Sequence, residues 1–489
     1  MLFNSHIFML LFLPLLLAGW YFLNWKKKFQ LAQGYLIGMS LWFYAYANLQ
    51  YLWLLLFSCL IGWLLSCLPE KIFSKKGKKV LTGVGCVFHL GLLGYFKYSN
   101  FFLENLNTVF HTDFPMLQIL LPVGISFYTF QQLAYLIDRC RGDAPRDSFF
   151  DYLTFMVYFP QLLQGPILLR SEFMGQLKEP ERRRFHAERF SEGIQFFVFG
   201  LAKKVLLADT LAKAVNYGYS NVSMLDSISA LLLAVGYLTE LYFDFSGYCD
   251  MAVGLGKMIG LEVAENFDAP FHSASVKEFW RRWHMTLGRF FTRYVYIPLG
   301  GNRRGKMRTL CNVMIVMLLS GLWHGAAWTF VLWGFLHGVG MIWDNLEHPH
   351  LPKKWMRQAA TFAYVCMTFV FFRAESIAQG FDVLKSIVSL KWNGFVFQMA
   401  SALDMTECYI ITKALSMKLP GLLSWFWLGI FVVLIAICFR VLSGEKVSGV
   451  VALQRQKGYG RLYPVLLAVL FTWSMISMTG VSEYLYFSF

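Results

Sequence analysis

Residues 311–344 read CNVMIVMLLSGLWHGAAWTFVLWGFLHGVGMIWD, and this apolar run decides how the chain is organised. The run is much longer than the roughly 20 residues that one helix needs to cross a membrane. Basic clusters flank it on both sides, at 277–308 and at 353–357. Because such clusters mark the cytoplasmic side of membrane proteins, we expect the run to enter and leave on that side, as a tight hairpin or as a re-entrant pair.

The composition extends this interpretation to the whole chain. Of 489 residues, 57% are hydrophobic and only 15% are charged, against roughly 25% charged in an ordinary soluble domain. Lipid must therefore solvate much of the apolar surface. The net charge of +15 does not indicate nucleic-acid binding, because the basic residues form short clusters between apolar spans and no recognition module is visible.

The same charge pattern predicts how the chain crosses the membrane. Lys26–Lys28 follow the apolar run 7–23 and no basic segment precedes it, which favours a retained first helix over a signal peptide. Residues 31–68 are expected to form a helical hairpin with its turn near Asn48. A second interrupted stretch, 149–169, also has basic residues on both sides and is broken by two prolines and a glycine.

Together these patterns predict an all-α polytopic membrane protein with about eleven spanning helices plus re-entrant or interfacial helices. We expect one membrane domain over 1–489, with N-terminal helices in 1–148, a core in 149–345 and C-terminal helices in 346–489. Both termini are expected on the extracytoplasmic side.

The segment 270–310 is unusual, because nine Lys or Arg accompany a single acid, Glu278, and are interleaved with aromatic residues. One interpretation is an amphipathic interfacial helix that binds anionic lipid. A second is an anionic ligand, since clustered guanidinium groups bind phosphates well, and a cytoplasmic acyl-CoA would suit this face. The two interpretations are compatible.

Two histidines in and after this segment are candidates for catalysis. His284 ends the stretch WRRWH at 280–284, and His324 lies in GLWHG at 321–325, where glycines allow backbone or substrate to approach closely. Ionisable groups at membrane depth are costly and usually functional. A neutral imidazole can take the proton of an acceptor hydroxyl as that hydroxyl attacks a thioester. His337 is expected to be structural.

Three acids, Glu240, Asp244 and Asp250, lie in or near an apolar span, with Glu240 and Asp244 on one helical face. Residues of this kind serve in ion or proton relays. Pairing with the many nearby arginines is the interpretation that we prefer.

Several motifs combine in one chain: FYTFQ at 127–131, FPQ at 159–161, GPI at 165–167, YFDFSGY at 242–248, EFWRRWH at 278–284, YIPLGGN at 296–302 and LWHGA at 322–326. With these motifs the chain resembles the bacterial membrane-bound O-acyltransferase family over essentially its whole length, in the branch of the alginate O-acetyltransferase membrane subunit. One departure is TRY at 292–294, where family members often have Arg-Asp-Tyr. Alginate itself need therefore not be the final acceptor.

The resemblance implies a ring of transmembrane helices around a thin centre, with a tunnel that links the two sides of the membrane. His324 matches the essential histidine of the family and His284 its second signature position, so both are expected to be catalytic. The residues expected to bind the donor are Arg281, Arg282, Trp283, Trp323 and Asn302.

The function that the resemblance implies is transfer of an acetyl group from cytoplasmic acetyl-CoA across the cytoplasmic (inner) membrane, for O-acetylation of an extracytoplasmic polysaccharide such as alginate. A periplasmic or cell-surface acetyltransferase is the expected partner. No metal and no cofactor are expected beyond the donor substrate, and the nine cysteines show no metal-ligand spacing.

Three alternatives stay open at this level. The first is D-alanyl transfer to teichoic acid, whose donor is a thioester on a carrier protein. The second is a polysaccharide or lipid exporter, which would share the broken helices and intramembrane charges. The third is a membrane scaffold. The residues also leave open the final acceptor, the oligomeric state and whether an acyl-enzyme forms.

Overall fold

The computed structural model describes residues 1–67, 75–346, 352–442, 446–458, 460, 462–478 and 484–485. Every regular element within these ranges is a helix, which confirms the all-α prediction. Contacts divide the chain into two compact units that interleave along the sequence. Unit 1 comprises Met1–Phe197, Cys249–Glu265 and Thr286–Pro298, and unit 2 comprises Val198–Tyr248, Asn266–Met285 and Leu299–Phe489. The single domain with three consecutive sections stays a prediction.

Unit 1 contains the expected N-terminal hairpin. The helices α2 (Phe29–Asn48) and α3 (Leu52–Cys67) are joined by one 3-10 turn at Leu49–Tyr51, so the turn predicted near Asn48 is confirmed. The other helices that lie wholly in this unit are η1 (Phe8–Phe12), α1 (Leu13–Trp25), α5 (Lys75–Leu93), η3 (Gly94–Tyr98), α6 (Ser99–Phe110), α7 (Ile125–Arg141), α8 (Phe149–Val157), α9 (Phe159–Leu162), α10 (Arg170–Leu177), η4 (Pro180–Arg183) and η8 (Thr292–Tyr296).

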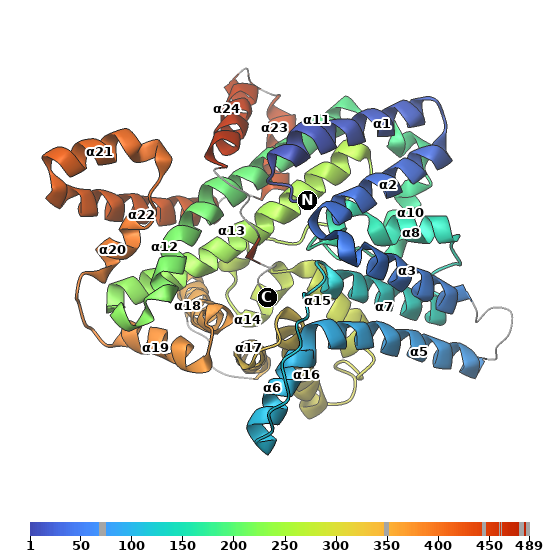
Figure 1. Cartoon of the computed structure of the whole chain (residues 1–489), viewed down its shortest axis with the longest axis horizontal. Coiled ribbons are helices and arrows are strands. Elements are labelled where there is room, and N and C mark those ends of the chain that lie inside the picture. The colour runs from blue at the N-terminus through green and yellow to red at the C-terminus, as the bar shows by residue number, and fades with distance from the viewer. Residues whose placement is uncertain are drawn as a thin grey trace. The chain divides into compact units, whose positions relative to one another are not determined.

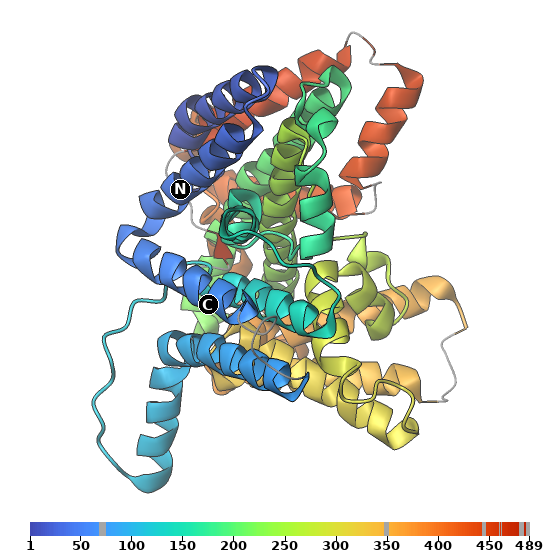
Figure 2. The same cartoon turned by 90° about the vertical axis from the view of Figure 1, so that its right-hand side faces the viewer.

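After α6 the chain returns as an extended segment rather than as a helix (Figure 2). Two asparagine side chains of α6 hold this segment by pairing with its backbone. The Asn100 amide donates to the carbonyl of Leu117 and accepts from its N–H, at 2.9 Å each, and Asn107 does the same with Phe114. The next helix, α7, therefore begins only at Ile125.

The interruption predicted within 149–169 is confirmed. After α8 comes the four-residue helix α9, and no helix forms between Leu162 and Arg170. Gly165 lies so close to the backbone of Pro160 and Gln161 that a side chain would collide with it. The chain can therefore turn this tightly only with glycine at that position.

The segment TRY at 292–294, which lacks the acid of the family pattern, is held in unit 1 by acids from elsewhere. The Arg293 guanidinium pairs with Asp138 at 3.0 Å and with Asp143 at 2.9 Å. The hydroxyl of Tyr294 donates to the second oxygen of Asp138 at 2.9 Å. Two carboxylates near the C-terminus of α7 therefore supply the negative charge that this segment lacks.

In unit 2, α12 (Asp209–Ser220) and α13 (Ser227–Ile259) run side by side (Figure 1), and Gly218 and Gly236 allow the close approach of Leu233 and Val215. The helices α11 (Ala187–Ala202), α13 and α15 (Met285–Phe291) contribute residues to both units. The other helices of unit 2 are η5 (Lys203–Ala208), η6 (Val222–Met224), η7 (Pro270–His272), α14 (Val276–Arg282), α16 (Lys306–His324), α17 (Trp328–Asn345), α18 (Lys354–Arg373), α19 (Ile377–Val388), α20 (Phe395–Ser401), η9 (Thr406–Cys408), α21 (Tyr409–Lys418), α22 (Pro420–Leu442), α23 (Val447–Lys457) and α24 (Leu462–Ser477).

The run at 311–344 folds as a helical hairpin, which confirms the first of its two predicted forms. It is divided between α16 and α17, which are joined by a short turn after His324. Gly334 faces the backbone of Met317 so closely that an added Cβ would lie 2.5 Å from that carbonyl oxygen, and Gly321 meets the carbonyl of Phe330 in the same way. Small residues at these positions bring the two helix backbones together, as is usual between membrane helices.

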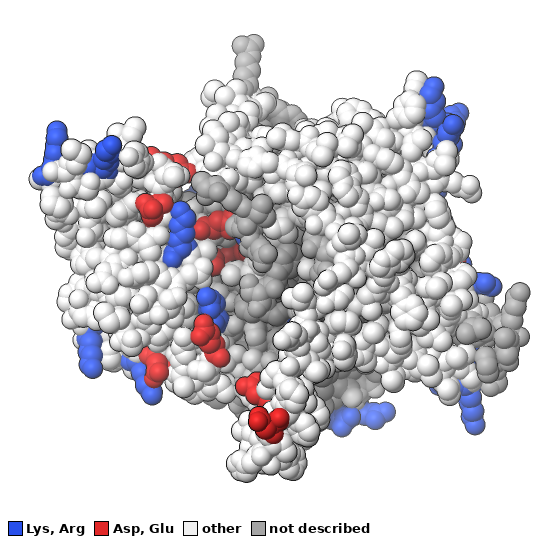
Figure 3. Space-filling model, viewed as in Figure 1, with Lys and Arg blue, Asp and Glu red and all other residues white. Residues whose placement is uncertain are grey.

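The protein is a membrane protein, and among the described residues six helical segments are long and apolar enough to cross a bilayer. They are Phe8–Trp25, Leu49–Cys67, Lys76–Phe110, Ser227–Ile259, Lys306–His324 and Pro420–Val441. Wide areas of the face in Figure 3 carry no charged side chain. The number of eleven spans, the ring with its tunnel and the extracytoplasmic termini stay predictions. The basic cluster at 71–79 is expected on the cytoplasmic side, and its residues 71–74 lie outside the described residues, as does the C-terminal Phe489.

Candidate active site

His324 is the last residue of α16, where Gly325 leaves the helix in an extended conformation. The imidazole is 4% exposed. Its ring centroid lies 4.9 Å from Trp323, 5.2 Å from Trp333 and 5.2 Å from Phe372. The hairpin turn and the end of α18 thus place this histidine in an aromatic box, which excludes water and fixes the ring plane.

His284 lies at the break between α14 and α15, and its backbone adopts a left-handed conformation with φ of 45°. The segment 266–268, which precedes α14, forms backbone hydrogen bonds on both sides of this break. The N–H of Asp268 donates to the carbonyl of Arg282 at 2.9 Å, and the N–H of Met285 donates to the carbonyl of Asn266 at 3.0 Å. A left-handed histidine is strained, and strained residues that neighbouring backbone holds in place are typical of functional sites.

The imidazole of His284 is fully buried and is oriented by the same segment. Its Nδ1 lies 3.2 Å from the side-chain oxygen of Asn266. Because an amide oxygen only accepts, Nδ1–H donates and Nε2 keeps a lone pair. Within the described residues Nε2 has no hydrogen-bond partner. Burial lowers the pKa of His284 from 6.5 to about 3, so the ring is neutral at physiological pH.

The two histidines that the sequence singled out lie together in unit 2. The ring centroids of His284 and His324 are 6.3 Å apart, and Trp323 lies beside both rings. Phe245 from α13 packs edge-on against His284 at 4.8 Å. Two buried imidazoles at this separation can share the handling of one proton at one reacting group.

His337, predicted to be structural, uses both of its ring nitrogens within the core. The indole N–H of Trp280 donates to Nδ1 at 3.2 Å, and Nε2 lies 2.9 Å from the hydroxyl of Thr368. That hydroxyl donates onward to the carbonyl of Val365 at 2.7 Å. Nε2 of His337 therefore carries the proton. Each group in this row of hydrogen bonds has a partner, and the arrangement agrees with a packing role for His337.

The expected donor-binding residues occupy different environments. Trp283 is buried in an aromatic cluster with Phe267 and Phe279, at 5.1 and 5.3 Å. Arg282 pairs with Glu278 at 2.9 Å, whereas Arg281 is exposed. Their role in donor binding stays a prediction.

Trp323 is buried beside the histidines, but Asn302 is exposed in the loop before α16. This loop and His324 lie at opposite ends of a helix that rises about 1.5 Å per residue. Asn302 is therefore not part of the histidine cluster, although the same loop brings the exposed Arg303, Arg304 and Arg308 together in sequence.

The interpretation of 270–310 as one amphipathic interfacial helix is wrong. The segment is divided among η7, α14, α15, η8 and the start of α16, and its aromatic residues Trp280 and Trp283 are buried. The helix can break at His284 because the backbone groups that the break exposes find other partners. These partners are the backbone groups of Asn266 and Asp268.

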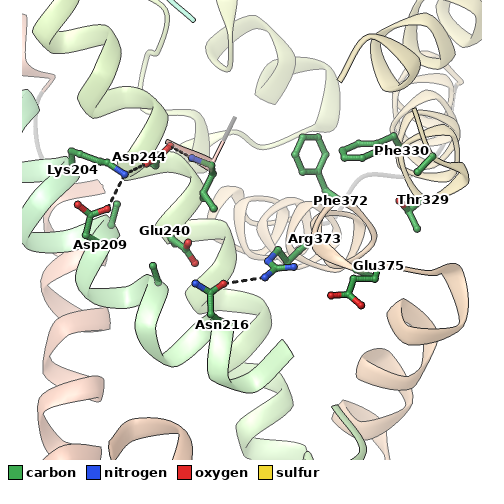
Figure 4. A pocket seen from close by; sticks show the side chains of 15 residues that line it. Lys204, Asp209, Asn216, Glu240, Asp244, Thr329, Phe330, Phe372, Arg373 and Glu375 are labelled. Carbon is green, nitrogen blue, oxygen red and sulfur yellow. Dashed lines mark hydrogen bonds and ion pairs between the residues drawn. The ribbon is translucent and has the colours of Figure 1, made fainter. Parts of the chain in front are cut away.

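A cavity of about 500 Å³ opens next to the aromatic box (Figure 4). Phe330 and Phe372 form one end of it, and Phe372 also packs on His324. The other lining residues are Lys204, Ala208, Asp209, Ala212, Asn216, Glu240, Asp244, Ala327, Thr329, Arg373, Ala374, Glu375 and Leu485. The cavity size is typical of sites for small molecules.

The acids of α13 are placed as predicted, but they are partnered differently. Glu240 and Asp244 do share one face, and both line the cavity. Asp244 pairs with Lys204 at 2.6 Å rather than with an arginine, and Lys204 also pairs with Asp209 at 2.8 Å. For Asp244 the expectation of an arginine partner is therefore wrong, and Asp250 does not line the cavity.

Residues of this region that were not singled out from the sequence include Lys204, Asn266 and Arg373. A signal existed for Lys204, because it is a lysine in an apolar stretch of a membrane protein and such residues are usually paired or functional. Arg373 carried a similar signal, because it ends the largely apolar stretch TFAYVCMTFVFF at 361–372, whereas Asn266 lies in the polar stretch AENFD at 264–268 and carried none.

Comparison with known proteins points the same way as this geometry. The model of the membrane-bound O-acyltransferase family matches residues 144–379, which contain both histidines. The peptidoglycan O-acetyltransferase of Helicobacter pylori is 35% identical over 423 residues, which is 80% of each chain. The probable alginate O-acetylase AlgI of Pseudomonas aeruginosa is 37% identical over 80% of this chain and 75% of its own. The teichoic acid D-alanyltransferase of Streptococcus thermophilus is 28% identical over 49% of this chain and 58% of its own.

Proposed function

We propose that this chain, which belongs to the membrane-bound O-acyltransferase family, uses acetyl-CoA from the cytoplasm to O-acetylate an extracytoplasmic polysaccharide. Membership of this family supports the O-acyltransferase activity and the membrane location. Our proposal adds that the acyl group is acetyl, that its donor is in the cytoplasm and that the acceptor is a polysaccharide such as alginate. It also places the protein in the inner membrane. We propose a periplasmic or cell-surface acetyltransferase as the partner protein, and both termini face the outside.

The observation that carries this proposal is the meeting of two buried histidines from distant segments. His284 and His324 come from opposite sides of a basic loop, yet their rings lie 6.3 Å apart beside a cavity. Names of relatives support the acetyl group, since proteins named as acetyltransferases match four fifths of the chain at 35–37% identity. D-alanyl transfer is the second candidate, supported by a relative that matches about half of the chain.

In the proposed reaction His324 acts as the general base. Its imidazole takes the proton of the acceptor hydroxyl while the hydroxyl oxygen attacks the thioester carbonyl. The carbon–oxygen bond of the ester forms, the carbon–sulfur bond breaks, and the CoA thiolate leaves with the proton that the imidazole carried. No covalent acyl-enzyme is needed in this scheme.

His284 assists in this scheme without changing its own charge. The Asn266 oxygen holds its Nδ1–H, so that Nε2 offers a lone pair next to His324. A hydrogen bond accepted there would orient the reacting group, because a buried neutral imidazole has a fixed direction and loses little solvation on reaction.

Donor binding is assigned to the basic segment around the start of α16. Arg303, Arg304 and Arg308 are exposed there, and the Arg308 guanidinium reaches the carbonyl of Leu299 at 3.4 Å. Guanidinium groups bind phosphate oxygens through paired hydrogen bonds, which suits the phosphates of CoA. Arg281 on α14 is exposed as well, and we assign it to donor binding too.

The test is the acetyl content of exported polysaccharide from cells that carry the wild-type protein, His324→Ala or the control His186→Ala, at matched membrane levels. His186 is exposed and lies outside the cluster. Loss of acetyl groups in His324→Ala alone, at unchanged polymer yield, is expected. Unchanged acetylation would overturn the role of His324, and loss of the polymer itself would favour an exporter.

A second assay separates the acetyl proposal from D-alanyl transfer. Purified protein is given acetyl-CoA with no carrier protein, water takes the place of the acceptor hydroxyl, and the free CoA thiol released by this hydrolysis is measured. Release of thiol by the wild type, but not by His324→Ala, supports acetyl-CoA as the donor. Release that requires a carrier protein would replace the acetyl proposal by the D-alanyl one.

A further inference from the structure

Glu240 is a buried carboxyl group in unit 2 to which the proposed reaction gives no task. The residue lies on α13, is 1% exposed and lines the cavity beside the aromatic box. Among the described residues its Oε2 has no hydrogen-bond partner. A buried polar atom without a partner costs free energy, so its retention suggests that a partner arrives from the cavity.

The basic groups of the cavity already have partners. Lys204 lies between Asp244 and Asp209, at 2.6 and 2.8 Å. Arg373 donates to the Asn216 side chain at 3.0 Å. Figure 4 shows Glu240 between the Lys204 cluster and Asn216, with its carboxyl turned toward the middle of the cavity. Among the described residues that line the cavity, Glu240 is thus a buried polar group with an oxygen left for a ligand.

The other lining groups define the chemistry of such a ligand. Thr329 and Asn216 offer hydroxyl and amide groups on the same cavity, and Phe330 and Phe372 close one end with apolar ring surface. A sugar ring matches this combination, because each hydroxyl both donates and accepts while the ring carries an apolar face. The phosphates of CoA do not match it, since four carboxyl groups line the cavity against two basic ones.

We propose that this cavity is the binding site for the carbohydrate that receives the acyl group, with Glu240 and Thr329 as residues that bind its hydroxyl groups. The inference rests on the proposed function and names where its acceptor binds. Phe372 connects the two sites, because it lines the cavity and packs on His324 at 5.2 Å. A sugar in the cavity therefore lies one side chain, Phe372, away from the proposed base, whereas the donor approaches from the basic segment.

The experiment measures binding of tetrasaccharides to the full chain in lipid nanodiscs by calorimetry. The probes are cellotetraose, chitotetraose and tetramannuronate. The variants are Glu240→Leu and Thr329→Val, which remove a polar group at nearly constant volume, and Glu240→Gln, which keeps hydrogen bonding. Asp382→Leu is the control, because Asp382 is exposed on α19 and pairs only loosely with Lys385 at 3.5 Å.

We expect at least one probe to bind the wild type and the Asp382→Leu variant equally. Glu240→Leu and Thr329→Val are expected to weaken that binding by about tenfold or more, as for the loss of a buried hydrogen bond. Glu240→Gln should retain most of the affinity. The cavity assignment is overturned if no probe binds, or if both polar-to-apolar variants, folded by their melting curves, bind like the wild type.

Failure of this inference and failure of the proposed function give different results. If the wild type releases thiol from acetyl-CoA but binds no sugar, the donor reaction stands and the acceptor is a side chain of the partner protein. If sugars bind in a Glu240-dependent way and no thiol is released, the cavity assignment stands and acetyl-CoA is the wrong donor.

Discussion

At the scale of single residues, the site depends on how buried imidazoles are held. His284 and His337 are both fully buried and both hydrogen-bonded through Nδ1, but the proton is on Nδ1 in His284 and on Nε2 in His337. His337 accepts at Nδ1 from Trp280 and has its Nε2–H engaged by Thr368. His284 donates from Nδ1 to Asn266 and keeps a lone pair at Nε2. The partner of Nδ1 thus decides whether a histidine fills the core or is available for chemistry.

The first prediction concerns Asn266 as a positioning residue. Asn266→Leu removes the acceptor that fixes the tautomer of His284, so we expect kcat for acetyl transfer to fall by about ten- to a hundredfold, part of the 10²–10⁴ that a positioned acid–base group supplies. KM for acetyl-CoA should not change. Steady-state kinetics of the purified protein measure both constants.

A conservative variant and a control accompany this experiment. Asn266→Asp keeps an acceptor oxygen and should retain more activity than Asn266→Leu. Within the described part of the chain the Asn221 side-chain amide bonds only to the carbonyl of Tyr217 in the preceding helix, so Asn221→Ala should leave kcat unchanged. Equal activity of Asn266→Leu and the wild type would show that His284 needs no orientation by Asn266.

The second prediction separates His337 from the two other histidines. His337→Leu leaves the indole N–H of Trp280 and the hydroxyl of Thr368 without their partner. We expect a loss of about 1–3 kcal/mol in the free energy of unfolding, with kcat per folded molecule near the wild-type value. Melting temperature and kcat are measured on the same preparation. A fall in kcat without a fall in melting temperature would assign His337 to the reaction instead.

At the scale of elements, the hairpin of α16 and α17 positions the site. Its turn presents His324 to the aromatic box, and Trp333 and His337 from α17 pack in the same core. The close contact of the two backbones at Gly321 and Gly334 sets the distance between the helices. Any residue larger than glycine at these positions must push the helices apart and move His324.

The third prediction tests this contact. Gly334→Ala would place its Cβ 2.5 Å from the Met317 carbonyl oxygen, so we expect destabilisation by about 1–3 kcal/mol, as in other overpacked cores. Acyl transfer should fall together with the melting temperature. Gly429→Ala in α22 is the matched control, because nothing lies within 4 Å of its added Cβ.

The control variant should stabilise the protein by up to about 1 kcal/mol, since alanine favours a helix over glycine. Equal melting temperatures of Gly334→Ala and Gly429→Ala would mean that the hairpin tolerates a wider separation. Thermal unfolding in detergent, followed by tryptophan fluorescence, gives both temperatures.

At the scale of the whole molecule, the distribution of charge predicts which side of the membrane each loop occupies. The basic clusters at 277–308 and 353–357 are expected on the cytoplasmic side, and the segment 98–115, which has no Lys or Arg, on the outside. The donor side of the proposed reaction depends on this assignment, because CoA is available only in the cytoplasm.

The fourth prediction is a labelling experiment in a Cys311→Ser background, since Cys311 is an exposed natural cysteine. Asn302→Cys should react with a membrane-impermeant maleimide only in inside-out vesicles. His111→Cys, at an exposed position of the opposite loop, should react only in intact spheroplasts. Labelling of both positions from one side would overturn the topology, and with it the cytoplasmic donor.

Much of the helical layout could be predicted because it depends on local properties of the chain. Apolar length, proline and glycine breaks and basic flanks located the hairpin at 31–68 and the interruptions in 149–169 and 311–344. Lipid imposes these features, since every backbone polar group at membrane depth needs an internal partner. His324 was found for a related reason, as an ionisable group between glycines at membrane depth, and the family resemblance singled out His284 with it.

The sequence by itself thus determined a helical membrane protein, its broken segments and its two histidines, because these follow from local composition and from the cost of placing polar groups in lipid. Only the tertiary structure decided that segment 266–268 breaks the helix at His284, that Lys204 rather than an arginine pairs with Asp244, and that Glu240 faces a cavity beside His324. Those contacts join segments far apart in the chain. They depend on which helix faces pack together, and no local pattern records that choice.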